Sequence, residues 1–181
     1  VFPLPSARAG CEYFVAEVSN MRSGIRLFLF LWSFCAAAAL SIAQGRDVPM
    51  PSSCTPQVNQ TLYQMIQNPP QSYLENVMVC GTAVSTTVNA GGRHGSHHII
   101  TLSVQMPDNS TVQVQVAIND SLDGAVSANP GQQVFAYGQG YIARGAWVAG
   151  IHDVHCSTHA AADNGWVVVD GAKTPASCPA R

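Results

Sequence analysis

Strict alternation of apolar and polar side chains marks one stretch of this sequence, Thr111-Val112-Gln113-Val114-Gln115-Val116-Ala117-Ile118. In an extended chain the valines and Ile118 fall on one side, and the two glutamines fall on the other. A period of two is typical of a β-strand that buries one face. We therefore take this stretch as the centre of a β-sheet and extend the interpretation in both directions.

Turn-forming residues divide the flanking sequence into segments of strand length. Pro107-Asp108-Asn109-Ser110 predicts a turn, residues 89–96 a loop, and residues 119–131 a polar connection with one helical turn. The other predicted strands are 77–84, 98–106, 133–141 and 147–151. Three strands, a connection and two strands follow the order of an oligonucleotide/oligosaccharide-binding (OB) barrel, although other small barrels and sandwiches share such a pattern.

A short helix is predicted upstream of these strands, over residues 57–67, and Asn68-Pro69-Pro70 ends it. The predicted fold is therefore mostly β: a small OB-like five-stranded barrel with a short N-terminal helix. We divide the chain into a Pro-rich leader with this helix (44–75) and a β-barrel domain (76–181).

The N-terminal region has the sequence pattern of a targeting segment. A basic start at Met21, an apolar core over residues 27–40 and the small residues Ser41-Ile42-Ala43 predict a secretory signal peptide over 21–43. A membrane anchor is the alternative, but a core of about 14 residues is shorter than the roughly 20 that span a bilayer. We expect a secreted or periplasmic protein with no stable membrane span after cleavage, and we interpret residues 1–20 as an upstream extension or cloning remnant.

Charge limits the choice of partners. Only 10% of the 181 residues are charged, and the formal net charge is −2. Residues 44–181 hold five cations and eight acids. Proteins that bind nucleic acid normally carry a basic groove with stacking aromatics, and the barrel has Arg93 and Arg144 but few other cations. We therefore expect no nucleic acid partner, and a small molecule or a glycan as the ligand.

Four cysteines follow the signal segment: Cys54, Cys80, Cys156 and Cys178. An even number in an exported chain predicts two disulfides, for which three pairings are possible. Free buried thiols are the alternative. A further alternative is that Cys156 is a nucleophile activated by His155. That role requires a free thiolate and therefore excludes a disulfide at Cys156.

All six histidines fall in two short stretches, 94–98 and 152–159. Clustered histidines are the compositional mark of a metal site, and three protein ligands with an open position describe a catalytic zinc. We predict a divalent metal, with zinc first, held by ligands from the set His94, His97, His152, His155 and His159. Asp153 or Asp163 would be the general base or would orient an imidazole. A polar site without metal and a purely structural role are the alternatives.

The C-terminal half also resembles a known family over residues 77–173. Gly150-Ile151-His152-Asp153-Val154-His155, followed by Gly165-Trp166 and Gly171, is similar to the motif of small exported bacterial proteins grouped as domain of unknown function 3465. Cys156 stands where that family usually has a further His, and Ala162 falls on a later family His. The resemblance implies an exported β protein with a role for His152, His155 and one His of the 94–98 loop. It implies no particular activity.

Three functions remain open on these residues. The first is a metal-dependent hydrolase. An ester or lactone is the expected substrate, because a weakly charged chain has few charged groups to bind a polyanionic substrate. The second is a non-catalytic binding module outside the cytoplasm for a metal, glycan or peptide. The third is a structural envelope protein. Trp147, Trp166 and Tyr141 are candidates for an apolar pocket wall or for the core.

Overall fold

The computed structural model describes residues 47–92, 95–159 and 162–179. The predicted upstream extension, the signal peptide and the first residues of the leader lie outside the described residues, as does His94. In the part of the chain that is described, no helix has the length and apolar character needed to cross a membrane.

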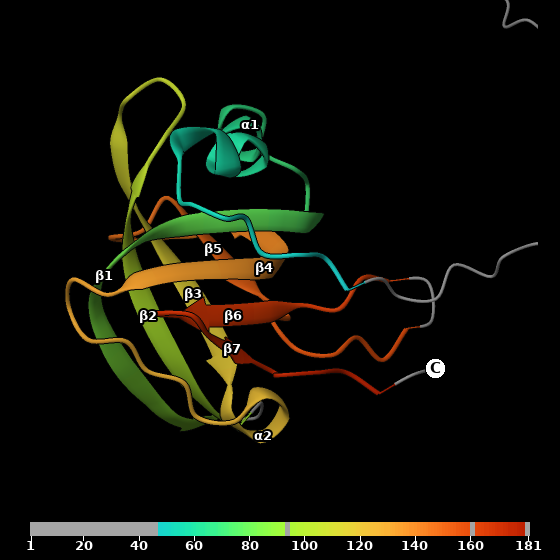
Figure 1. The fold of residues 1–181 in the computed structure, drawn as a ribbon. Coiled ribbons are helices and arrows are strands. Elements are labelled where there is room, and N and C mark those ends of the chain that lie inside the picture. The colour runs from blue at the N-terminus through green and yellow to red at the C-terminus, as the bar shows by residue number, and fades with distance from the viewer. Residues whose placement is uncertain (1–46, 93–94, 160–161, 180–181) are drawn as a thin grey trace, which may run out of the picture. The chain divides into compact units, whose positions relative to one another are not determined.

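One seven-stranded sheet dominates the fold (Figure 1). In chain order the elements are η1 (Pro56–Asn59), α1 (Gln60–Gln67), β1 (Leu74–Gly92), β2 (Gly95–Gln105), β3 (Thr111–Asn119), α2 (Asp120–Asp123), β4 (Gln133–Ile142), β5 (Ala149–His152), β6 (Trp166–Val169) and β7 (Ala172–Thr174). The alternating stretch of the sequence is β3, and its buried residues include Val114, Val116 and Ile118.

Five of the strands close into a ring. Their order is β1-β2-β3-β5-β4, and β4 pairs back onto β1. The β3–β5 pair is parallel, and the other pairs are antiparallel. The prediction of a mostly β, barrel-like fold with five strands and a short N-terminal helix is confirmed. The predicted helical turn after β3 is also present, as α2.

The ring encloses the main apolar core. Buried valines, leucines and isoleucines from all five strands fill it, and Leu62 and Met65 of α1 pack into the same cluster. A second cluster joins Phe135 and Tyr137 to Trp166 on the other face of β4. Alternate residues of β4 thus belong to two cores, which explains why the strand is apolar along nearly its whole length.

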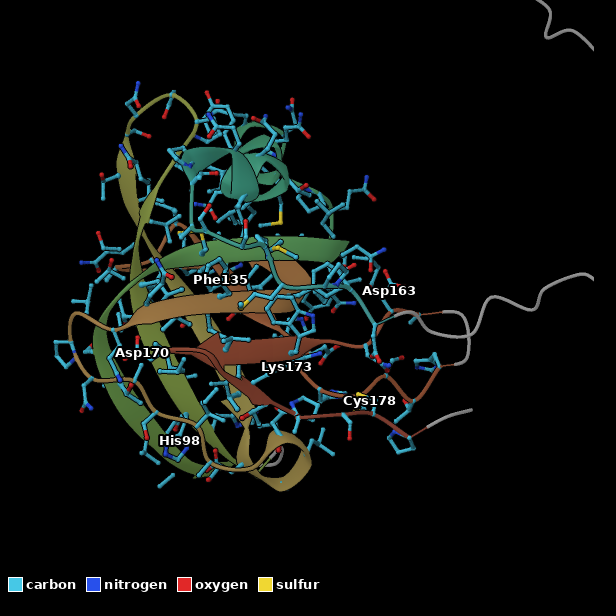
Figure 2. All side chains as sticks on the ribbon, viewed as in Figure 1. His98, Phe135, Asp163, Asp170, Lys173 and Cys178 are labelled. Carbon is cyan, nitrogen blue, oxygen red and sulfur yellow. A yellow bond between two sulfur atoms is a disulfide. The ribbon has the colours of Figure 1, made fainter. Side chains whose placement is uncertain are left out.

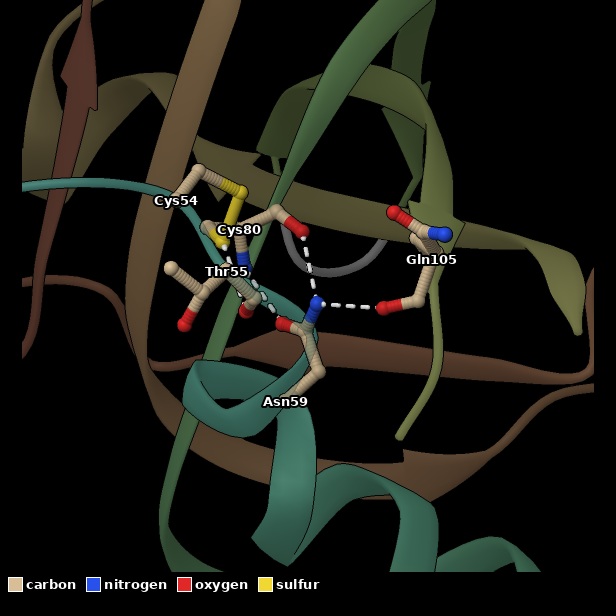
Figure 3. Close-up of a disulfide and its surroundings, with 5 residues drawn as sticks. All are labelled: Cys54, Thr55, Asn59, Cys80 and Gln105. Carbon is tan, nitrogen blue, oxygen red and sulfur yellow. Dashed lines mark hydrogen bonds between the residues drawn. A yellow bond between two sulfur atoms is a disulfide. The ribbon is translucent and has the colours of Figure 1, made fainter. Parts of the chain in front are cut away.

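The leader covers the second cluster. Trp166, which is 1% exposed, donates its Nε1–H to the carbonyl of Val48 at 2.9 Å, and Nδ2 of Asn164 donates to Oδ1 of Asp47 at 2.9 Å. A disulfide between Cys54 and Cys80 fixes the leader to β1 (Figure 3). Trp166 is therefore a core residue, one of the two roles expected for it.

Both predicted disulfides are present, and the structure selects one of the three pairings. Cys54 pairs with Cys80, and Cys156 pairs with Cys178. The alternatives of free thiols and of a nucleophilic Cys156 are therefore wrong, because a disulfide sulfur has no thiolate to offer.

Two parts of the sheet differ from the prediction. Residues 89–92 and 95–96 were predicted as loop, but they continue β1 and β2, where Gly92 pairs with Gly95 and Asn89 pairs with His97. Cross-strand pairing there overrides the turn preference of Asn and Gly. The strands β6 and β7 were missed: β6 is a four-residue run buried on both faces, which shows no alternation, and β7 has only three residues.

Candidate functional site

The candidate site is built on a loop that leaves the sheet and returns to neighbouring positions. β5 and β6 both pair with β4: His152 lies opposite Gln139, and Trp166 lies opposite Tyr137. Only Gly138 separates these two positions of β4. Residues 153–165, which we call the site loop, therefore start and end at one narrow neck. The described residues of this loop form no helix.

Two glycines make this neck possible. A Cβ on Gly138 would lie 2.3 Å from the carbonyl oxygen of His152, and one on Gly165 would lie 2.1 Å from that of Asp153. Such approaches are far closer than van der Waals contact, so only glycine fits at either position. The N–H of Gly165 donates to the carbonyl of His155 at 2.8 Å and ties the two ends of the loop together.

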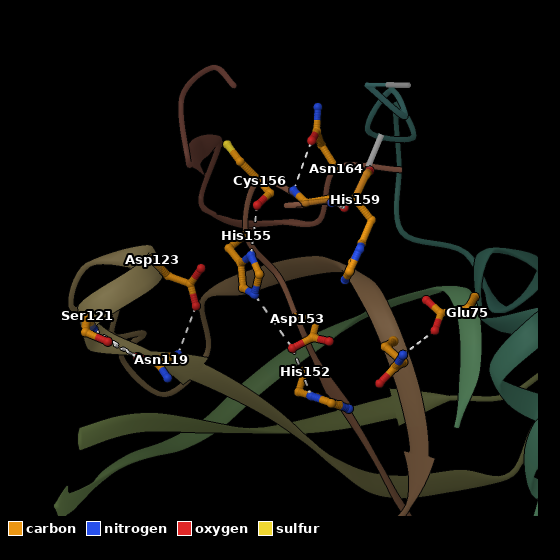
Figure 4. A network of polar contacts seen from close by, with 12 residues as sticks. Glu75, Asn119, Ser121, Asp123, His152, Asp153, His155, Cys156, His159 and Asn164 are labelled. Atoms are coloured by element: carbon orange, nitrogen blue, oxygen red, sulfur yellow. Dashed lines mark hydrogen bonds and ion pairs between the residues drawn. The ribbon is translucent and has the colours of Figure 1, made fainter. Parts of the chain in front are cut away.

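Asp153 is the first residue of the site loop and has a φ of 54°. This left-handed conformation is uncommon for a residue with a side chain, and such strain persists only where the surrounding structure enforces it. Its Oδ1 lies 3.2 Å from Nδ1 of His152 and 3.6 Å from Nε2 of His155 (Figure 4). One carboxylate oxygen thus faces two imidazole rings.

The ring of His155 is oriented by the backbone. Its Nδ1 lies 3.0 Å from the carbonyl oxygen of Cys156, and a carbonyl can only accept a hydrogen bond. The neutral ring must therefore carry its proton on Nδ1, which leaves the lone pair of Nε2 facing Asp153. The Cys156–Cys178 disulfide holds the residue that supplies this carbonyl.

His152 lies among aromatic rings. Its centroid is 4.9 Å from that of Tyr73 and 5.2 Å from that of Tyr141. Its Nε2 is buried and has no hydrogen-bond partner among the described residues. Burial raises the pKa of Tyr141 to about 12, so this hydroxyl stays protonated, and it accepts a hydrogen bond from Nε2 of Gln115 at 2.6 Å.

Two pockets meet at Asp153 and His155. The large pocket has a volume of about 590 Å³, and its wall includes Glu75, Gln139, Ser157, His159 and Asp163. The small pocket has a volume of about 280 Å³, and its wall includes Tyr73, His97, Leu122, Tyr141 and His152. Because Asp153 and His155 line both, a ligand in either pocket reaches the same pair of side chains.

Sequence reasoning missed a buried carboxylate near the site that lines neither pocket, Asp123 at the end of α2 (Figure 4). Its side chain is buried, with 8% of the residue exposed. Oδ2 accepts a hydrogen bond from the N–H of Asn119 at 2.9 Å, whereas Oδ1 finds no partner in the described parts of the chain. Burial raises the pKa of Asp123, while the charges of His155 and His97 act to lower it. Only its place at the end of the predicted helical turn could have drawn attention to it.

The structure distributes the predicted site residues over the two pockets. His97, His152, Asp153 and His155 line the small pocket, and His159 and Asp163 line the large one with Asp153 and His155. Asp163 accepts a hydrogen bond from the hydroxyl of Tyr137 at 2.9 Å. Of the predicted aromatic wall, Tyr141 lines a pocket, and Trp147 donates its Nε1–H to Thr101.

The predicted zinc site finds no match in the residues that the structure describes. Among them, no group of three or more His, Cys, Asp or Glu side chains is arranged to hold a metal ion. The predicted ligand His94 lies outside the described residues. The metal site therefore stays a prediction.

His98 belongs to a separate cluster beside α2, away from Asp163 (Figure 2). Its Nδ1 lies 2.6 Å from Oδ1 of Asp120, and the hydroxyl of Ser96 donates to the other oxygen of the same carboxylate. These three residues join the start of β2 to α2. Neither pocket is lined by them.

This cluster predicts part of the acid sensitivity of the fold. The hydrogen bonds from Ser96 and His98 hold the pKa of Asp120 below its ordinary value of 3.8. A carboxyl with a lowered pKa contributes stability above its unfolded pKa and loses that contribution as the pH falls through its folded pKa. We expect Asp120→Asn to lose less stability than the wild type below about pH 4, measured as Tm against pH. Tm curves of the wild type and the variant that fall in parallel at acid pH would contradict this.

No protein-family model, curated protein or solved structure matches this chain. The resemblance to domain of unknown function 3465 therefore rests on the motif residues alone and stays a prediction. The structure gives those residues physical roles: Gly165 and Trp166 close the neck, and His152 and His155 flank Asp153.

Proposed function

We propose that this protein binds a small polar ligand outside the cytoplasm, in the two pockets that meet at Asp153 and His155. The observation that carries the proposal is the pair formed by Nε2 of His155 and Oδ1 of Asp153. The two atoms lie 3.6 Å apart on the shared wall, and both accept hydrogen bonds when His155 is neutral. A hydroxyl or amine group of a ligand can reach both atoms.

The surroundings of this pair suit a small polar molecule or a glycan. The ring of Tyr73, which is 55% exposed, offers an apolar face beside the pair. Carboxylate and amide groups of Glu75 and Gln139 line the neighbouring pocket. Apolar walls with a few converging polar groups are typical of ligand sites.

Location outside the cytoplasm is the second part of the proposal. Two disulfides are compatible with an oxidising compartment, and the segment 21–43 has the pattern of a secretory signal. Fusing residues 21–43 to a reporter enzyme that is active only after export tests this part. Retention of the reporter inside the cell would contradict it.

Hydrolysis of an ester or lactone is a second candidate function, favoured by the tautomer of His155. Nε2 can take a proton from a water molecule that lies in the pocket beside it and Asp153. The water oxygen then bonds to the carbonyl carbon, the carbon–oxygen bond of the ester breaks, and the leaving alkoxide takes the proton back from His155. Asp153 stabilises the imidazolium that forms between these two steps.

The test combines binding and turnover on the disulfide-bonded protein. We expect butanediol and glucose to shift the backbone amide NMR signals of Asp153 and His155. His155→Asn should weaken this binding by roughly tenfold, the effect of losing one hydrogen bond worth about 1.4 kcal/mol. His98→Asn is the matched control, because His98 lies outside both pockets, and it should bind as the wild type does.

Turnover of γ-butyrolactone separates the two candidate functions. Lactone opening that is lost in His155→Asn and kept in His98→Asn supports the hydrolase. Binding without any turnover supports the binding module. Ligands that shift only signals remote from Asp153 and His155 would overturn both.

A further inference from the structure

The two pockets follow one another around the ring of strands. Along the order β2-β3-β5-β4-β1, the small pocket takes its strand residues from β2 to β4, and the large pocket takes them from β4 and β1. Asn119 of the small pocket and Glu75 of the large one lie on opposite sides of Asp153 and His155 (Figure 4). Neighbouring strands are about 4.8 Å apart, so the pockets together extend over roughly 20 Å of sheet. A ligand that fills both pockets must be elongated.

The pocket walls carry neutral polar groups and negative charge. Gln139 and Asn119 contribute amides, and Ser157 contributes a hydroxyl. Glu75 and Asp153 contribute carboxylates, and none of the described residues that line the pockets is a lysine or an arginine. An anionic chain would be repelled by this surface. A chain of hydroxyl groups is complementary to it, because each hydroxyl both donates and accepts.

Tyr73 supplies an aromatic surface to the small pocket. Its ring centroid lies 4.9 Å from that of His152 and 6.4 Å from that of Tyr141, yet 55% of the residue is exposed. An exposed aromatic ring held by its neighbours can pack against the C–H face of a sugar ring. Glu75 follows two residues later and lines the other pocket, so one elongated ligand can contact both side chains.

Backbone strain is concentrated in the large pocket. Among the described residues, four that are not glycine have a positive φ. Asn109 and Asp170 lie in the turns of the β2–β3 and β6–β7 hairpins, where this conformation is usual. The other two, Asn76 and Asp153, both line the large pocket. Strain of this kind clusters at functional sites, so it marks this wall as a binding surface.

A β-bulge positions the polar groups on the β1 side of the large pocket. The register shift between Leu74 and Val77 places one extra residue of β1 opposite Gln139. Bulges are common beside binding sites, where they re-aim a side chain. Within this bulge Glu75 accepts a hydrogen bond from Nε2 of Gln139. The second carboxylate oxygen of Glu75 and Oε1 of Gln139 offer two neighbouring acceptors for the hydroxyl groups of a sugar.

We propose that the ligand is a neutral oligosaccharide of at least two sugar rings, with one ring stacked on Tyr73 and the next hydrogen-bonded to Glu75 and Gln139. This inference rests on the proposed function and names the class of its ligand. Asp153 and His155 bind hydroxyl groups where the two rings join. A peptide binds best along a free strand edge, whereas β1, β4 and β5 pair on both sides within the sheet.

Tetrasaccharides test the inference on the disulfide-bonded protein, with cellotetraose, maltotetraose and mannotetraose as probes. We expect at least one of them to shift the amide signals of both Asn119 and Glu75. It should bind at least roughly tenfold more tightly than its own monosaccharide, because the second ring adds hydrogen bonds. Equal affinity of the single sugar would overturn the inference. Tighter binding of tetragalacturonate would overturn it in favour of an acidic glycan, and tighter binding of tetraalanine in favour of a peptide.

The same titrations separate this inference from the proposed function. If butanediol shifts the amide signals of Asp153 and His155 while all three tetrasaccharides fail to do so, the oligosaccharide is excluded and the proposed function stands. If neither butanediol, glucose nor any tetrasaccharide shifts them, both are overturned.

Tyr73→Ala tests the stacked ring. It should weaken binding of the tetrasaccharide by roughly tenfold, through loss of the aromatic contact. Tyr73→Phe is the matched control, since it keeps the ring and removes only the hydroxyl, and it should bind as the wild type does. Equal weakening in the two variants would overturn the stacked arrangement.

Glu75→Ala tests the second ring. It should weaken binding of the tetrasaccharide by roughly tenfold and leave binding of the monosaccharide on Tyr73 unchanged. Gln71→Ala removes an exposed polar side chain from the same segment outside both pockets, and it should change neither. A loss of both affinities in Glu75→Ala would show that Glu75 supports the fold of the site. That result, or unchanged tetrasaccharide binding, would overturn the assignment of the second ring.

Discussion

Gly165→Ala is expected to destabilise the protein by about 3 kcal/mol and to abolish ligand binding in both pockets. The added Cβ would lie 2.1 Å from the carbonyl oxygen of Asp153 and 2.8 Å from Cα of Val154. Both neighbours are backbone atoms at the neck of the site loop, so neither can move aside as the end of a flexible side chain can. Displacing this segment moves Asp153 away from His152 and His155.

Urea unfolding and amide chemical shifts measure the two parts of this expectation. Gly171→Ala is the matched control: Gly171 has a φ of 85°, and a Cβ there meets nothing within 4 Å. It should cost only the strain of an alanine in the left-handed region, about 1–2 kcal/mol, and keep ligand binding. Similar losses of stability and binding in the two variants would show that the neck is not what positions Asp153.

Asn59→Ala is expected to destabilise the fold by about 4 kcal/mol, a large share of the 5–15 kcal/mol by which domains are stable. Asn59 is 1% exposed. Its Nδ2 donates to the carbonyls of Cys80 and Gln105 at 3.1 and 3.0 Å, and its Oδ1 accepts from the N–H of Cys80 at 2.7 Å. Alanine would remove the partner that these three backbone groups share, and both groups of Cys80 are buried (Figure 3).

Two further variants make the Asn59 measurement specific. Asn59→Asp keeps the acceptor but loses both donated bonds and buries a charge, so it should cost at least as much as alanine. Asn68→Ala changes an exposed asparagine at the other end of the same helix and should cost less than about 1 kcal/mol. A small effect of Asn59→Ala on the urea midpoint would mean that water replaces the lost side chain.

The sequence predicted the features that depend on local pattern. Alternation in β3 and the turns around it indicated the strands of the ring, because a half-buried strand leaves a period of two in any sequence. The cysteine count indicated two disulfides. Asp153 between two histidines was visible as well, since residues so close in sequence meet whenever a tight turn follows a strand.

Features that depend on contacts distant in sequence could not be predicted. Leu122 of α2 lines the small pocket because α2 follows β3, whose partner β5 carries His152. β6 gives no periodic signal, since leader residues cover its outer face and the ring core lies behind it. The two pockets depend on the neck at Gly138 and Gly165. The residues around one of these glycines in the sequence do not indicate that the other lies close to it in the fold.

The neck has an evolutionary consequence. Because the site loop begins and ends beside two positions of one strand that only Gly138 separates, the described residues of 155–164 take no part in the strand pairs that close the ring, whereas Val154 packs into its core. Loops anchored in this way tolerate insertion, deletion and exchange at little entropic cost. The same scaffold can therefore acquire new ligand preferences when the site loop is replaced as one continuous segment, provided that Asp153, Gly138 and Gly165 are kept.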